Sequence, residues 1–332
     1  MSLAVAILLL VVFRLITSSV DLYIADTALL AAIPAIGLNM LTGNAGQVSI
    51  GTAAFMAVGA YTIVVFNGHV GFVPAVLIAG LICAVLGALV GLPSLRLRGL
   101  YLAFSTLSLQ YLVAYAVQEY DQHTNALAGH TISTPSVFGF DIASDSAWYV
   151  TFAICVLLCM AAGQLVRDGR PGRAWEQVRT SEVVASSVGV RVATAKVSAF
   201  AVSAFLAGCT GALYAYFVGN VSASYFSLSL AISYIAMIII GGLGSIWGSV
   251  VGAIGVTALP FILRSLVGDF AGYQSVSGWL ATNQYDVDTI AYGALIIVFL
   301  IFEPGGLVGL AGRARTVGKR LSSALRVRDR AR

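Results

Sequence analysis

The feature that most limits the fold of this chain is a succession of long apolar runs separated by short polar segments. A helix needs about 20 mainly apolar residues to cross the roughly 30 Å hydrocarbon layer of a membrane. The runs lack the alternating pattern of outer-membrane strands, so they predict helices. We expect an all-α polytopic membrane protein with about ten transmembrane helices, approximately at Leu3–Ser19, Ala28–Leu41, Ile50–Phe66, Phe72–Leu92, Leu100–Val117, Trp148–Val166, Val197–Val218, Ser224–Ile240, Gly248–Leu263 and Thr289–Phe302.

Composition excludes the soluble classes. Of the 332 residues, 59% are hydrophobic and 10% are charged, whereas a soluble domain carries roughly 45–50% apolar and about 25% charged residues. So few charged residues among so many apolar ones exclude a disordered chain, a coiled coil and a cytosolic enzyme.

The first apolar run has neither a basic start nor a small-residue cleavage site before Asp21. We therefore interpret it as a retained helix, with a signal peptide as the alternative.

The basic residues predict the orientation of the chain in the membrane. With ten spans, every segment rich in Lys and Arg falls on one side, and segments without them fall on the other. The positive-inside rule then places both termini in the cytoplasm. All Lys and Arg except Arg14 and Arg264 follow this arrangement. The cytoplasmic segments would be the turn with Arg96 and Arg98, the loop Arg167–Lys196 and the tail after Gly312, and the outer ones Glu119–Ala147 and Ser265–Asp288.

The net charge of +4 comes mainly from these segments. A charge confined to loops and a tail indicates topology and a lipid bilayer as the surroundings, rather than a surface that binds nucleic acid. We expect a transmembrane permease domain over residues 1–312, followed by a basic cytoplasmic tail over 313–332.

Two of the apolar runs are broken by glycine-rich segments, at Leu41–Ser49 and at Gly241–Ser245. Glycine-interrupted hydrophobic segments are the best sequence indication of a translocation path. The alternative is an ordinary turn between helices, followed by a packing face of small residues. The candidate path residues are Gly43, Asn44, Gly46, Gln47, Ser49, Gly51, Thr52, Gly241, Gly242 and Gly244.

The sequence predicts no catalytic, cofactor or metal site. Ionisable residues are expected only at or near the ends of spans, so the relay of an ion-coupled carrier is missing. The segment Gly312–Arg320 departs from the spacing of a phosphate-binding loop. Cys155 and Cys159 share a helix face, and buried thiols are favoured over a metal or redox pair. Energy for uphill transport would therefore have to come from another chain.

The central loop contains a predicted short helix, Gly172–Gly189. Pro171 is suited to its start and Gly189 to its end. Trp175, Val178, Ala185 and Val188 fall on one side, and Arg173, Glu176 and Arg179 lie off it. Such a helix can dock into a groove of a partner or rest on the lipid interface. Its mixture of acidic and basic residues favours a protein partner.

Several motifs resemble one family in order along the chain. Gly37–Phe55 closely resembles the start of the LivM-type permeases of branched-chain amino acid ABC importers. The resemblance covers about residues 34–312. It continues through the arginine-containing turn Leu95–Ala103, the helix Gly172–Gly189, and the motifs Gly208–Leu213, Gly241–Gly248 and Pro304–Leu310.

The resemblance implies a type II ABC importer-like permease in the inner (plasma) membrane. Such a subunit pairs with a related second permease subunit, two cytoplasmic ATP-binding subunits and an extracytoplasmic solute-binding protein. It translocates leucine, isoleucine, valine or a similar small solute, and no cofactor is implied. Thr180-Ser181 and Ser186-Ser187 depart from the family pattern. The residues assigned to the ATPase-coupling loop are Glu176, Arg179, Glu182, Ala185 and Gly189, to which we add Arg173 and Trp175.

Two alternatives remain at this point. One is a permease of the same superfamily that carries urea, a sugar or a nucleoside. The other is a channel or carrier that works without ATP. The sequence does not distinguish the solutes, because it does not reveal which helix faces line a cavity.

Overall fold

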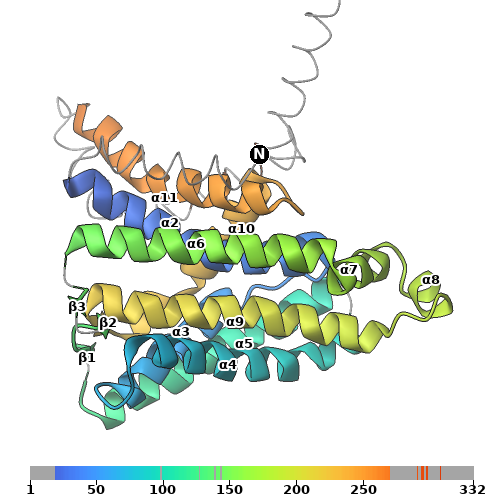
Figure 1. The fold of residues 1–332 in the computed structure, drawn as a ribbon, viewed down its shortest axis with the longest axis horizontal. Helices are drawn as coiled ribbons and strands as arrows, with labels where there is room; N and C mark the ends of the chain where they lie inside the picture. Colours follow the sequence, from blue (N-terminus) through green and yellow to red (C-terminus); the bar gives the residue numbers. More distant parts are fainter. Residues whose placement is uncertain are drawn as a thin grey trace, which may run out of the picture.

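The computed structural model is a bundle of long helices with short strands at one end (Figure 1). The structure describes residues 19–97, 99–126, 128–137, 140–142 and 144–269, together with residues 290, 293, 294, 297 and 307. The helices within these residues are α2 (Ser19–Asn39), the π-helix η1 (Met40–Asn44), α3 (Thr52–Phe66), α4 (Phe72–Gly91), the 3-10 helix η2 (Pro93–Leu95), α5 (Leu100–His123), α6 (Asp145–Asp168), α7 (Arg170–Thr180), α8 (Glu182–Ser187), α9 (Val192–Val218), the 3-10 helix η3 (Ala223–Phe226), α10 (Leu228–Gly241) and α11 (Ile246–Asp269). The strands are β1 (His130–Thr131), which pairs antiparallel with β4 (Asn220–Val221), and β2 (Ser136–Val137), which pairs antiparallel with β3 (Phe140–Asp141).

The predicted all-α class is confirmed. The second to ninth predicted spans correspond to α2, α3, α4, α5, α6, α9, α10 and α11. By length and composition, five helices of the described residues could cross a membrane, and three further apolar helices have 10–17 residues. The first predicted span lies outside the described residues, and the tenth is described only at 290, 293, 294 and 297. The count of ten therefore stays a prediction.

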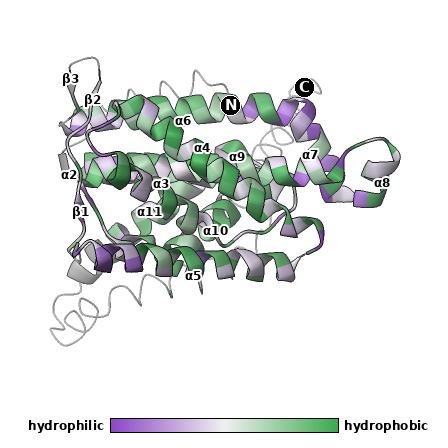
Figure 2. Ribbon diagram, turned by 90° about the horizontal axis from the view of Figure 1, so that it is seen from below, coloured by the Kyte–Doolittle hydropathy of each residue, from purple (hydrophilic) through white to green (hydrophobic). Residues whose placement is uncertain are grey.

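The turns between the helices gather at two opposite ends of the bundle (Figure 1). One end, here called the α7 end, holds α7, α8, η2 and the breaks after α2 and α10. The opposite end, here called the strand end, holds the four strands and η3. Figure 2 shows hydrophobic residues along the helices and hydrophilic ones concentrated toward the ends. The α7 end carries Arg96 and the segment Arg167–Lys196, so these predicted basic segments do lie together.

Helices α3, α4 and α9 pack closely against one another. A Cβ added at Gly59 of α3 would lie 2.1 Å from the carbonyl oxygen of Gly208 in α9. One added at Gly211 of α9 would lie 1.9 Å from the carbonyl oxygen of Met56 in α3. Small residues let membrane helices approach this closely. The glycines of these helices therefore set the distance between the backbones.

Helix α2 begins earlier than predicted, at Ser19 rather than Ala28, and η1 continues it to Asn44. It therefore includes Asp26, whose side chain is fully buried. The expectation that ionisable residues lie only at or near the ends of spans missed this residue. A carboxylate counts against an apolar run when hydropathy is read from the sequence. In the folded chain, tertiary packing encloses it.

Candidate functional site: the α7–α8 loop and the helix breaks

The predicted helix Gly172–Gly189 is two helices, α7 and α8, joined at Ser181. Ser181 is extended (φ −163°, ψ 119°), and its hydroxyl accepts a hydrogen bond from the amide of Val184. A serine that caps a helix start in this way ends one helix and begins the next. Pro171 lies in the first turn of α7, as predicted, and Gly189 has φ +85°, which suits its predicted role as the end of the helix.

The inner side of this loop is anchored on the bundle by apolar side chains. Trp175 is 1% exposed, and Val178 and Ala185 are also buried. The indole Nε1 of Trp175 donates to the hydroxyl of Ser198 in α9 at 3.1 Å. Burial of an indole with its N–H paired fixes both the depth and the rotation of a helix. Helix α7 is therefore held firmly against α9.

A partly buried ion pair holds α8. Glu182 Oε1 lies 2.8 Å from Lys196 Nζ, and the Lys196 side chain is buried. The same ammonium donates to the carbonyl of Ser94 in η2 at 3.0 Å. An ammonium that is removed from water needs such partners. Glu182 thus faces inward and fastens the loop to two other elements of the α7 end.

Arg179 also reaches inward, from an otherwise exposed position. Its guanidinium Nη1 donates to the carbonyl of Gly43 in η1. Gly46, at φ +70°, lies against the stem of the same side chain, since a Cβ there would be 2.8 Å from Arg179 Cγ. The α7–α8 loop therefore touches the first helix break directly.

The outer surface of the loop carries the residues that remain available to a partner. Arg173 and Glu176 are exposed on α7. On and just after α8, Val183, Val184 and Val188 are 76%, 61% and 65% exposed. The expectation that Val188 lies on the inner side is wrong, because the bend at Ser181 changes the direction of the chain. Sequence analysis did not single out Val183 or Val184.

The first helix break is an ordered turn rather than a loose loop. After η1, the segment from Ala45 to Gly51 is neither helix nor strand. The amide of Gln47 donates to the carbonyl of Leu41, and the amide of Ile50 donates to the hydroxyl of Thr106 in α5. Non-helical backbone at membrane depth requires such partners. Two backbone amides of the break are therefore satisfied by the chain itself.

Asn39, at the end of α2, holds the second break. Its Nδ2 lies 3.1 Å from the carbonyl oxygen of Gly242, 2.9 Å from that of Ser245 and 2.8 Å from the hydroxyl of Ser249. Its Oδ1 accepts from the amide of Gly244 at 2.7 Å. One buried side chain thus satisfies a turn more than 200 positions away, and no local sequence pattern indicates this contact.

The two breaks are also in backbone contact. A Cβ at Gly43 would lie 2.3 Å from the amide nitrogen of Gly244. The structure therefore brings the two groups of predicted path residues together at the α7 end. Whether they line a path stays a prediction. Among them, Gly43, Gln47, Ser49, Gly51, Thr52, Gly241 and Gly242 are buried, Asn44 and Gly244 are half-buried, and Gly46 is exposed.

Residues 22–300 match the profile of the family described as "Branched-chain amino acid transport system / permease component". This chain belongs to that family. The permease is 30% identical to the high-affinity branched-chain amino acid transport system permease protein LivM of Escherichia coli (strain K12), over 92% of this chain and 74% of the relative. It is 30% identical to the protein of the same description from Salmonella typhimurium, over 89% of this chain and 71% of the relative.

A probable branched-chain amino acid transport permease protein LivM of Methanocaldococcus jannaschii is 22% identical, over 70% of this chain and 67% of the relative. No solved structure matches the permease. The family confirms the predicted resemblance, and with it a multi-pass permease of the inner membrane and a role in an ABC importer.

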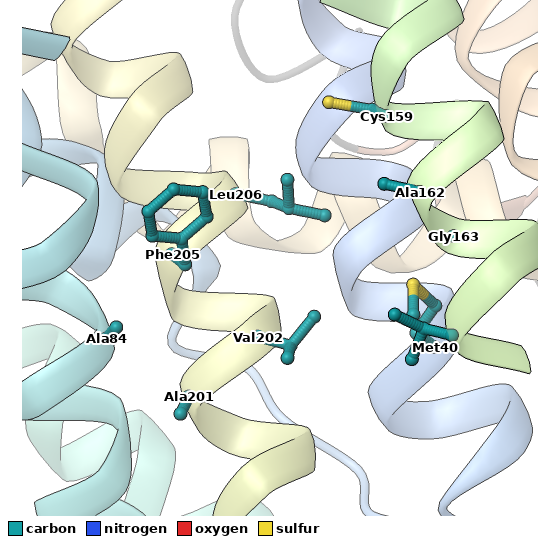
Figure 3. Close-up of a pocket in the computed structure, with 10 residues that line it drawn as sticks. Met40, Ala84, Cys159, Ala162, Gly163, Ala201, Val202, Phe205 and Leu206 are labelled. Atoms are coloured by element: carbon teal, nitrogen blue, oxygen red, sulfur yellow. The ribbon is translucent and has the colours of Figure 1, made fainter. Parts of the chain in front are cut away.

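The permease also has an apolar cavity of about 340 Å³ between α9 and α6, with Met40 of η1 behind it (Figure 3). Val202, Phe205 and Leu206 line it from α9, and Cys159 and Gly163 from α6. This lining offers no charged group and no strong hydrogen-bonding side chain. The cavity therefore has nothing to orient the ammonium and carboxylate of an amino acid.

A second polar cluster lies at the strand end. Asp121, in the last turn of α5, accepts from the Tyr61 hydroxyl at 2.7 Å and from the Ala223 amide at 3.1 Å. His130 Nε2 in β1 lies 3.2 Å from the same carboxylate. His130, which lies in the segment expected to form an outer loop, thus belongs to a network around the buried Asp121. The outer loop predicted to begin at Glu119 starts later, because α5 extends to His123.

Proposed function

We propose that this permease is one membrane subunit of an ATP-driven importer for branched-chain amino acids. It would work with a related second permease subunit, two cytoplasmic ATP-binding subunits and an extracytoplasmic solute-binding protein. Hydrolysis of ATP would occur on the partners, and this chain would catalyse no reaction. Family membership supports this assembly, and the names of the relatives support the class of solute.

The observation that carries the proposal is the outer surface of the α7–α8 loop. Three exposed valines, Val183, Val184 and Val188, lie on and just after α8, and the charges Arg173 and Glu176 are exposed on α7. Apolar side chains grouped on an exposed surface indicate an interface. The inner side of the same loop is anchored by Trp175 and Glu182, so a push on the valines would reach the bundle. We assign this surface to the ATP-binding subunits and the α7 end to the cytoplasm.

The basic residues support this orientation. Arg96 and the segment Arg167–Lys196 lie at the α7 end, whereas Lys and Arg are absent from the described part of the loop between α5 and α6 at the strand end. Positive residues are retained on the cytoplasmic side. The strand end would then face the solute-binding protein. The termini and the tail over 313–332 lie outside the described residues, and we keep the prediction that both are cytoplasmic.

Transport in proteoliposomes tests the proposal. The permease is reconstituted with its partner subunits, and ATP-dependent uptake of radiolabelled leucine is measured, with isoleucine, valine, urea and ribose as competitors. We expect uptake that requires ATP and is inhibited by isoleucine and valine. Inhibition by urea or ribose alone would instead indicate the other solute class, and leucine flux through the permease alone would contradict the ATP-driven mechanism.

A paired substitution tests the docking surface. Val184→Asp places a carboxylate in the proposed interface, and an unpaired charge that must be buried weakens binding strongly. We expect at least about a tenfold loss of leucine uptake and less co-purified ATP-binding subunit. Thr194→Asp, at an exposed position near the start of α9, should retain both. Equal behaviour of the two variants would remove α8 from the interface.

A further inference from the structure

The contact between Arg179 and Gly43 joins the α7–α8 loop to η1, which lies at the first helix break. Arg179 lies in the last turn of α7, and the residue is exposed. Its guanidinium nevertheless donates to a carbonyl of η1, and Gly46 lies against its stem. The side chain of Arg179 therefore makes an internal contact and is not free to bind a partner.

The carbonyl that Arg179 binds belongs to a helix end. The last carbonyls of a helix have no partner within it, and they carry the negative end of its dipole. Lysine and arginine side chains stabilise such ends by hydrogen bonding. Here the arginine comes from a different element, so α7 caps the end of α2 and η1 from outside.

The capped segment is fastened in turn to α10 and α11. Gly43 touches the backbone of Gly244, without a side chain on either residue to yield. One helical turn earlier, Asn39 binds the turn at Gly242, Gly244 and Ser245. The contacts form an unbroken series from α7 through η1 to the turn between α10 and α11.

We propose that Arg179 and Asn39 are positioning residues that make α7, the end of α2 and the turn between α10 and α11 move as one unit. This inference rests on the proposed function, in which partner subunits push on α7. The Arg179 contact passes that movement to η1, and Asn39 passes it to the second break. Arg179 is then an internal link, which changes its role from the partner-contacting one that the family resemblance implied.

The first test separates linkage from folding. In proteoliposomes with the partner subunits, Arg179→Ala should lower leucine uptake about tenfold, because a hydrogen bond from a charged group contributes about that factor. ATP hydrolysis should continue at close to the unmodified rate, since the outer surface of the loop is intact. Arg191→Ala removes an exposed arginine at the same end and should keep both activities. A parallel fall in uptake and hydrolysis, or unchanged uptake in Arg179→Ala, would overturn the proposal.

The second test replaces the hydrogen bond by a covalent one. A Cβ at Gly46 would lie 3.3 Å from Arg179 Cβ, close to the separation of about 3.5–4.5 Å in disulfides. The double variant Gly46→Cys, Arg179→Cys should transport poorly when reduced and recover leucine uptake when oxidised. Strain from a side chain at the positive φ of position 46 is present in both states and cancels. The single-cysteine variants, oxidised in parallel, control for the native cysteines.

The outcomes identify which idea fails. If the unmodified complex shows no ATP-dependent leucine uptake, the proposed function fails. If it transports and the oxidised double variant stays as inactive as the reduced one, the contact must open during the cycle, and the proposed linkage is wrong.

Discussion

The close approach of α3 and α9 leads to a quantitative prediction for Gly211→Ala. The new methyl group would lie 1.9 Å from the carbonyl oxygen of Met56, whereas a carbon and a carbonyl oxygen approach to about 3.3 Å at closest. The obstacle is backbone, so no side chain can rotate away, and the helices must separate by about 1 Å. A gap of that size forfeits a quarter to a half of the dispersion energy of each affected contact.

We estimate a loss of about 3 kcal/mol, at the upper end of the usual cost of overpacking. For a chain of this size, that corresponds to a fall of about 4 °C in the midpoint of thermal unfolding. The assay is heating of the detergent-solubilised permease, followed by measurement of the monodisperse fraction. Gly255→Ala is the matched control, because no atom lies within 4 Å of a Cβ at that position of α11. Its midpoint should stay or rise slightly, since alanine is the better helix former. Equal midpoints for the two variants would refute the argument from close packing.

Three further predictions concern polar and aromatic anchors. Glu182→Gln should leave the Lys196 ammonium without its charged partner and cost about 2–3 kcal/mol of stability, measured as faster limited proteolysis of the α7–α8 loop. Adding Lys196→Met should reverse most of that effect. Failure to reverse it would contradict the ion-pair explanation. Asp121→Asn should lower the thermal midpoint by several degrees, because charge-assisted hydrogen bonds are weakened, whereas Asp145→Asn at an exposed position should change it little. Trp175→Ala should cost about 3–5 kcal/mol, measured as loss of folded permease from the membrane, and wild-type levels would show that the indole does not anchor α7.

The existence of most helices could be predicted from the sequence because each apolar run is long. Their ends were less accurate where polar residues are buried by contacts with distant elements. Helix α5 was expected to end at Val117 and continues to His123, because Asp121 finds partners in α3 and η3. Helix α2 was expected to begin only at Ala28, because Asp26 interrupts the apolar run in the sequence. It begins at Ser19 and includes Asp26.

The parts of the candidate site were predictable, but their joining was not. Glycine-rich breaks and a helix between basic residues are local patterns, and local patterns can be read along the chain. The bonds of Asn39 to a turn more than 200 positions away have no local signature. The inward direction of Glu182 and Arg179 is equally hidden, since it depends on the bend at Ser181 and on the neighbours that packing supplies.

The fastening of the strand end has a mechanical consequence. Asp121 ties the far tips of α3 and α5 to η3, and the pairing of His130 with Val221 in β1 and β4 ties the following loop to the residues after α9. A protein that binds the strand end would contact elements that are joined to one another. Force on one of them would tilt several helices together. If these helices tilt together about the strand end, the largest displacement for a given tilt occurs at the α7 end.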